Sequence, residues 1–208
     1  MWRLATLTIV ITAAMVAPAA GQRRVHVGAK VGPSFTTIAL EEDDGRTYHR
    51  RIAAAGGGFV VLPLAARVAA QFEVLSSPKG SRLEEPGDTF TQTMKLRYLE
   101  FPVLLRVAGP KQRIGAWYFM GGGSFGVRTG ATAEIASVTN SIMAGERSDA
   151  SALIERFEGG VVAGAGLNAG RYLVVEGRYG RGLTNVNKVA DSPRFTNRAL
   201  TFMVGVRY

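Results

Sequence analysis

"RALTFMVGVRY", residues 198–208, alternates apolar side chains with small, polar or charged ones. Leu200, Phe202, Val204, Val206 and Tyr208 fall on one face of an extended chain, opposite Thr201, Met203, Gly205 and Arg207. Because successive side chains of a β-strand point to opposite faces, this stretch predicts a strand with one apolar face and one mixed face.

The same period of two recurs along the chain, in residues 25–31, 64–74, 98–107 and 172–179. Three less regular segments bring the predicted number of strands to eight: 51–62, 113–128 and 156–169. Together they predict an all-β protein.

The connections between these strands alternate strictly between short and long. The short ones lie at 63–64, 109–113 and 168–171, and the long polar ones at 36–49, 76–92, 129–155 and 181–196. This alternation is typical of an up-and-down antiparallel barrel that has its tight turns at one end and its long loops at the other.

The charged residues decide which face of such a barrel points outward. If the apolar face meets lipid, the lumen receives a set of polar and charged side chains: Lys30, Arg67, Gln71, Glu73, Glu100, Arg106, Glu176, Arg178 and Arg207. The opposite arrangement would place these charges in hydrocarbon, at ~2–4 kcal/mol for each Lys or Arg at the midplane. We therefore predict a transmembrane barrel whose lumen holds a structural network of ion pairs.

Two alternatives remain open at this point. Bases outnumber acids in the predicted lumen, so the barrel could instead be a small gated pore that prefers anions. A soluble, secreted ligand-binding barrel or a β-sandwich would expose the charged face to water, and alternation alone does not exclude it.

The N-terminus predicts a cleaved signal peptide. Arg3 precedes an apolar run at 4–16, and small residues such as Ala19 follow it, as signal peptidase requires. The run is short for a transmembrane helix. We therefore expect a signal peptide at 1–21 and a barrel domain at 22–208.

The composition argues against several classes of protein. The chain of 208 residues has a formal net charge of +9, but its Lys and Arg residues are dispersed, which argues against nucleic acid as a partner. The absence of Cys excludes disulfides and thiolate metal sites. We expect no cofactor and no metal site.

Three glycines have the spacing of a nucleotide-binding motif without its context. Gly121, Gly123 and Gly126 match G-x-G-x-x-G, but the residues that follow lack the amphipathic helix that a dinucleotide-binding turn requires. Similar glycine clusters at 56–58 and 159–170 favour the strands of a narrow barrel, where glycine makes room for bulky neighbours.

The chain offers little for catalysis. His26 and His49 are its two histidines, and the candidate nucleophiles Ser34 and Ser124 have no local motif. We therefore expect no catalytic residues and a protein that is not an enzyme. In the long loops, segment 148–157 could form a short helix capped by Ser148 or Asp149.

Several stretches resemble the PorT-like and OmpA-like family of small outer-membrane β-barrels. They are "VGAKVGPSF" at 27–35, "YLEFPVLLR" at 98–106, and "YGRGLTNV" at 179–186 with the C-terminal strand. The resemblance covers nearly all of residues 22–208. It implies an eight-stranded antiparallel up-and-down transmembrane barrel in the bacterial outer membrane, in contact with lipid and lipopolysaccharide.

The resemblance also implies a role for the last strand. Such barrels usually end in an aromatic residue that the barrel assembly machinery reads, which assigns this signal to Phe202, Val204, Val206 and Tyr208. The usual signal has Gly five residues before the final aromatic, where this chain has Met203. Family members serve structural, adhesive or secretion and envelope-accessory roles, so the long loops are expected to meet an envelope or extracellular protein.

Overall fold

The computed structural model describes residues 24–40, 47–84, 90–112, 115–139, 142–149, 151, 154–186 and 195–208. In this part of the chain, no helix is long and apolar enough to cross a membrane. The described strands are β1 (His26–Leu40), β2 (Thr47–Pro63), β3 (Val68–Glu84), β4 (Phe90–Gln112), β5 (Gly115–Thr139), β6 (Ile142–Asp149), β7 (Phe157–Ala169), β8 (Leu173–Gly182) and β9 (Phe195–Arg207).

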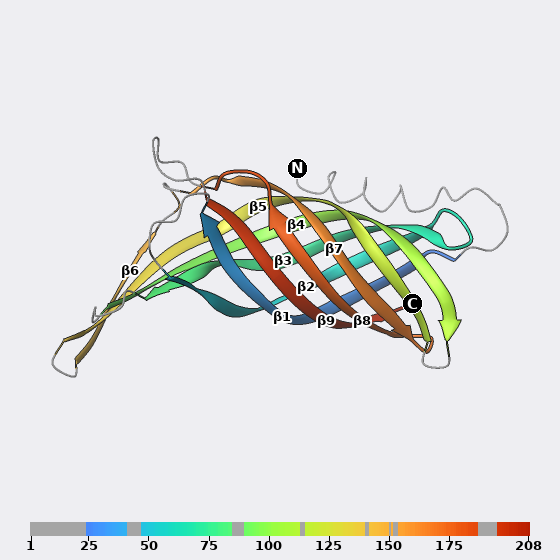
Figure 1. The fold of residues 1–208 in the computed structure, drawn as a ribbon, viewed down its shortest axis with the longest axis horizontal. Coiled ribbons are helices and arrows are strands. Elements are labelled where there is room, and N and C mark those ends of the chain that lie inside the picture. The colour runs from blue at the N-terminus through green and yellow to red at the C-terminus, as the bar shows by residue number, and fades with distance from the viewer. Residues whose placement is uncertain are drawn as a thin grey trace, which may run out of the picture.

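Eight of these strands close into an antiparallel barrel (Figure 1). Consecutive strands pair around the ring, and β5 pairs with β7 because β6 lies outside it. β9 returns to pair with β1, with Val204 opposite Val31, and so leaves the ring without an edge. The prediction of an eight-stranded up-and-down barrel is confirmed.

The two ends of the barrel differ. The connections at 64–67, 113–114 and 170–172 lie at one end, together with the start of β1 and the end of β9; we call this the turn end. The strand ends that flank the long connections lie at the opposite end, the loop end. The termini of the barrel therefore meet at the turn end, where Val27 and Tyr208 exchange backbone hydrogen bonds.

The barrel is apolar outside and charged inside. Val31 is 61% exposed on the outer face of β1, whereas the neighbouring Lys30 is 3% exposed in the lumen. Valine, leucine and phenylalanine continue this outer band around the other strands. A soluble protein rarely exposes so continuous an apolar surface, which fits a barrel surrounded by lipid.

Several strands run further than the sequence predicted. β4 has 23 residues and β5 has 25, whereas about 9–11 residues suffice to span a membrane. Parts of the predicted loops 36–49, 76–92 and 129–155 are therefore strand. The predicted helix at 148–157 is also wrong, because β6 extends to Asp149 and β7 begins at Phe157.

A β-bulge in β5 explains why the sequence predicted a loop at 129–155, where β5 in fact continues to Thr139. Tyr98 pairs with Arg128 while Arg97 pairs with Gly130, so Thr129 is an extra residue. Because one inserted residue exchanges the two faces of a strand, Ala131 points inward beyond the bulge although even-numbered residues point inward before it. The alternation that identifies a strand is broken there, and the sequence predicted a loop.

Candidate functional site

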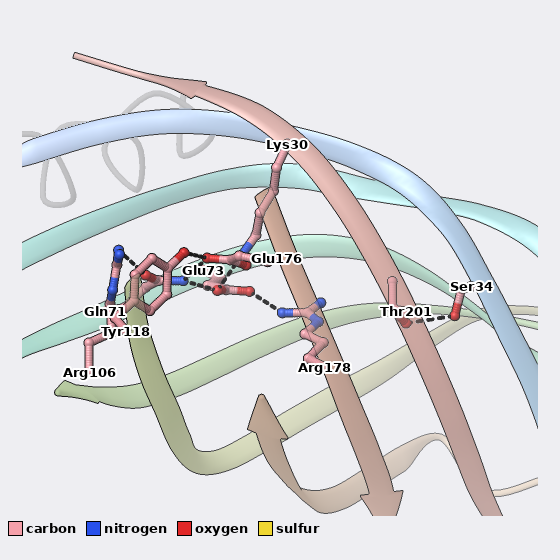
Figure 2. Close-up of polar contacts among 9 residues, drawn as sticks. All are labelled: Lys30, Ser34, Gln71, Glu73, Arg106, Tyr118, Glu176, Arg178 and Thr201. Atoms are coloured by element: carbon pink, nitrogen blue, oxygen red, sulfur yellow. Dashed lines mark hydrogen bonds and ion pairs between the residues drawn. The ribbon is translucent and has the colours of Figure 1, made fainter. Parts of the chain in front are cut away.

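A cluster of polar side chains crosses the lumen at mid-height (Figure 2). Its residues come from five strands: β1, β3, β4, β5 and β8. Alternation turns all of these side chains inward. We call this group the central cluster: Lys30, Gln71, Glu73, Arg106, Tyr118, Glu176 and Arg178.

Glu73 is the most heavily bonded carboxylate of the central cluster. It accepts hydrogen bonds from Lys30 Nζ at 2.7 Å and from Arg178 at 2.6 Å. Gln71 Nε2 also donates to it. The side chain of Glu73 is 0% exposed, so two cations and one amide replace the water that it would otherwise bind.

Glu176 links the central cluster to the other side of the barrel. Lys30 forms an ion pair with it as well as with Glu73, and so bridges carboxylates from β8 and β3. Tyr118 donates its hydroxyl proton to Glu176 at 2.6 Å. Arg106 stacks over the Tyr118 ring, 3.5 Å from its centroid, and donates to Gln71 Oε1 at 2.7 Å.

A second group of charges lies nearer the loop end. Lys79 Nζ is 2.5 Å from Glu100 Oε1 and 3.1 Å from Glu158 Oε1. Asn197 Nδ2 donates to Glu158 Oε2 at 3.0 Å. We call Lys79, Glu100, Glu158 and Asn197 the outer cluster. The sequence prediction included Glu100 but missed Lys79 and Glu158.

A small polar cavity separates the two clusters. Its walls include Ser77, Lys79, Glu100, Arg178 and Thr201, and its volume is about 30 Å³. A cavity of this size holds about two water molecules. The cavity is lined by members of both clusters, so the two clusters lie close together along the lumen.

A small apolar cluster lies on the inner face of the barrel near the loop end. Ile154 is 2% exposed and packs against Leu96, Tyr98 and Ala131 on the inner faces of β4 and β5. The backbone of the next residue, Glu155, donates a hydrogen bond to the Val186 carbonyl at 2.8 Å. The segment before β7 and the segment after β8 are therefore linked beyond the ends of these two neighbouring strands.

The fully buried charges of the described residues are balanced. Among the described residues, the buried charged side chains are four bases and four acids: Lys30, Lys79, Arg106 and Arg178 with Glu73, Glu100, Glu158 and Glu176. The sequence had predicted five bases and three acids, because it included Arg67 and Arg207 and missed Lys79 and Glu158.

The two arginines lie at the turn end instead. Arg67 is exposed in the bend between β2 and β3, where Val68 O accepts hydrogen bonds from the backbone of Leu64 and Ala65, so its assignment to the lumen was wrong. Arg207 faces inward but is only half-buried, at the mouth of the barrel.

Glycines provide the space that the central cluster occupies. A Cβ at Gly205 would lie 2.6 Å from Lys30 Cβ, and one at Gly166 would lie 2.3 Å from the Tyr118 ring. The three glycines with nucleotide-motif spacing, Gly121, Gly123 and Gly126, lie within β5, and no helix begins there. They are barrel glycines and not a phosphate loop.

The residues of the predicted assembly signal lie on the outer face of β9. Phe202, Val204 and Val206 are all about half-exposed, and Tyr208 is 72% exposed. Tyr208 packs against Tyr172, with 5.5 Å between ring centroids. These side chains are available to another molecule before the outer face meets lipid.

The candidate catalytic residues do not come together. His26 Nδ1 lies 3.3 Å from the Tyr208 carbonyl oxygen at the turn end. Ser34 is hydrogen-bonded to Thr201 at 2.9 Å, eight positions further along β1, which corresponds to about 26 Å. Among the described residues, no three His, Asp or Glu side chains form a group suited to a metal ion.

Comparison with solved structures finds small outer-membrane proteins. Ail, the attachment invasion locus protein of Yersinia pestis, is 11% identical with a TM-score of 0.45, over 89% of this chain and 99% of that one. Neisserial surface protein A is 10% identical with a TM-score of 0.44, over 88% and 97%. OprG from Pseudomonas aeruginosa is 9% identical with a TM-score of 0.43, over 88% and 95%.

No curated protein sequence matches the chain. A family model described as outer membrane protein beta-barrel domain matches residues 14–188, which is most of the chain. Together with the closed barrel and its apolar outer face, this match establishes that the chain belongs to the outer membrane protein beta-barrel domain family and is a protein of the bacterial outer membrane.

Proposed function

We propose that this protein is a non-enzymatic barrel with a closed lumen, which holds a rigid β-sheet outside the membrane for contact with an envelope or extracellular protein. Its role would then be structural, adhesive or accessory to secretion. The observation that carries the proposal is the central cluster, whose ion-paired and hydrogen-bonded side chains cross the lumen.

The sheet is the part of β4 and β5 beyond the bulge, residues 90–97 and 130–139, together with β6; we call it the extension (Figure 1). β6 pairs with β5 from Thr132 to Thr139 and so widens it. In small outer-membrane barrels the long connections face the exterior, which puts the extension outside the cell.

Side-chain contacts on both faces hold the part of the extension next to the barrel. Its inner face carries Leu96 and Ala131, which pack with Ile154 as a continuation of the barrel core. Its outer face carries an ion pair between Lys95 and Glu134. A rigid scaffold that projects polar side chains is suited to recognition, because little conformational entropy is lost when a partner binds.

A polar hollow on the extension offers a place for such contact. Its walls include Arg97, Thr129, Thr132, Ser148 and Asp149. It joins the bulge of β5 to the end of β6, and so lies where three strands meet. The charges of both signs at its rim favour a polar segment of a protein partner over an apolar ligand.

The outer surface suggests two further partners. The apolar band of the barrel would meet outer-membrane lipid and lipopolysaccharide. The exposed side chains of Phe202, Val204, Val206 and Tyr208 would be read by the barrel assembly machinery before insertion. The pore alternative requires the central cluster to open, and the balance of buried charges gives no basis for anion preference.

Planar-bilayer recording of the refolded protein tests the closed lumen. Folding is checked first by the mobility difference between unheated and boiled gel samples. We expect no discrete conductance steps from the wild-type protein. The double variant Glu73→Ala with Arg178→Ala removes one acid and one base from the central cluster, so it should conduct. Stable steps from the wild-type protein would refute the closed barrel and support a pore.

A further inference from the structure

The turn end of the barrel is basic and its sequence holds no acid. Exposed or half-buried arginines surround it, one from each described strand end or turn: Arg24, Arg67, Arg171 and Arg207. We call these four the basic rim. The described segments at this end, 24–29, 60–70, 105–112, 115–120, 165–174 and 203–208, contain no Asp or Glu.

Backbone hydrogen bonds fix the basic rim in place. The Arg67 carbonyl accepts a hydrogen bond from Ala108 at 2.7 Å, which ties the first turn to the end of β4. Arg207 N donates to the Tyr172 carbonyl at 2.8 Å, which ties the last strand to the third turn. The backbone of two members of the basic rim is thus fixed, and the described residues at this edge include no Asp or Glu side chain.

One member of the basic rim has an unmet hydrogen-bonding group. Arg207 Nε is buried and has no hydrogen-bond partner among the described residues. Leaving such a donor unpaired costs free energy, but Arg207 faces the lumen, so the outward contacts of the basic rim fall to Arg24, Arg67 and Arg171. Arginine suits phosphate in particular, because its planar group donates two parallel hydrogen bonds.

Aromatic side chains place the basic rim at the depth of lipid headgroups. Arg171 lies over the Tyr172 ring, 5.3 Å from its centroid, and Tyr172 packs against Tyr208. On another side of the barrel, Trp117 packs edge-on against Phe119 at 4.9 Å. Tryptophan and tyrosine favour the boundary between hydrocarbon and headgroups, where phosphates lie within reach of the arginines.

We propose that the basic rim binds the phosphates of anionic phospholipids in the periplasmic leaflet. The turn end faces the periplasm in barrels of this type. Clustered bases at a membrane surface attract anionic lipids, and this attraction is screened by salt. The bound lipid would neutralise the basic rim and anchor the turn end at a fixed depth.

Fluorescence quenching by brominated lipids tests this proposal, because Trp117 lies at the same end. The full chain with Trp2→Phe has Trp117 as its single tryptophan. It is refolded into vesicles that contain brominated phosphatidylglycerol or brominated phosphatidylcholine in a background of the unlabelled other lipid. We expect phosphatidylglycerol to associate about threefold more strongly at low salt, with the preference lost at about 1 M salt.

Matched variants assign the effect to the basic rim. Arg67→Gln combined with Arg171→Gln should reduce the ratio towards one. Arg181→Gln combined with Arg198→Gln removes the same charge from exposed arginines near the loop end, and should leave the ratio unchanged. Equal quenching by the two lipids at low salt, or an equal loss in both double variants, would overturn the proposal.

Sedimentation with purified peptidoglycan separates this proposal from cell-wall binding. Lipid binding predicts no sedimentation of the refolded protein that depends on Arg67 and Arg171. Sedimentation lost in Arg67→Gln with Arg171→Gln, together with equal lipid quenching, would assign the basic rim to the cell wall and refute the lipid proposal. Neither result depends on whether the lumen conducts.

Discussion

The central cluster and the outer cluster differ in how completely their buried charges are paired. Both place charges inside a narrow barrel, away from bulk water. In the central cluster Glu73 has three donors, and Lys30 bridges two carboxylates. In the outer cluster one ammonium group, on Lys79, serves both Glu100 and Glu158.

The two clusters also differ in what they leave unpaired. In or beside the outer cluster, Tyr98 Oη and Asn197 Oδ1 are buried without a hydrogen-bond partner among the described atoms. In the central cluster, the side-chain exposure of Lys30, Glu73 and Arg178 is 1%, 0% and 7%, against 9%, 10% and 2% for Lys79, Glu100 and Glu158. The central cluster, which excludes water, pairs its charges more completely than the outer cluster does. This is expected because burying an unpaired charge costs free energy.

The largest loss in the free energy of unfolding should come from Glu73→Gln. The variant keeps the shape of the side chain but leaves Lys30 and Arg178 with one fewer negative charge between them. Breaking a buried ion pair costs about 3–5 kcal/mol, so the free energy of unfolding should fall by this amount. Urea unfolding in lipid vesicles, followed by circular dichroism, measures it. Glu134→Gln, in a partly exposed ion pair, is the control and should cost less than about 1 kcal/mol.

Lys79→Met should cause an intermediate loss in the free energy of unfolding. It removes the one cation shared by Glu100 and Glu158, but these groups lie closer to the loop end and its water. We expect a loss of about 2–3 kcal/mol in the free energy of unfolding. Lys95→Met makes the same change in a half-exposed ion pair and should cost at most about 1 kcal/mol. Equal losses in the two lysine variants would contradict the difference in burial.

Glu100→Gln should change the free energy of unfolding least. The outer cluster has two carboxylates for one ammonium group, so Lys79 keeps Glu158 as a partner after the change. The relief of repulsion between the carboxylates offsets part of the lost attraction, and we expect a change within about 1 kcal/mol. A loss as large as that of Glu73→Gln, under the same urea conditions, would show that the outer cluster needs both acids.

The same contrast explains how much could be predicted from the sequence. Lys30, Glu73 and Glu176 lie in segments that alternate cleanly, so their inward positions follow from period two. Lys79 lies between Pro78 and Gly80, a pattern that predicts a turn, and its strand was read as part of a loop. Glu158 begins an irregular glycine-rich segment whose inward face carries little polar signal.

The extension could not be predicted for a related reason. A bulge at Thr129 reverses the faces of β5, and an alternation count stops where the faces reverse. The partners within the lumen were also beyond the sequence. Lys30 contacts Glu73 and Glu176 across the closed ring, and the register that brings them together depends on how far the strands are staggered around the barrel.

Cysteine accessibility tests the closed lumen most directly, because the chain has no cysteine of its own. Ser77→Cys places a thiol in the wall of the cavity between the two clusters, and Ser148→Cys places one at the exposed end of β6. We predict that a charged, water-soluble thiol reagent modifies Ser148→Cys in the folded protein but modifies Ser77→Cys only after unfolding. Modification of Ser77→Cys in the folded protein, at a rate similar to that of Ser148→Cys, would contradict a lumen closed by ion pairs.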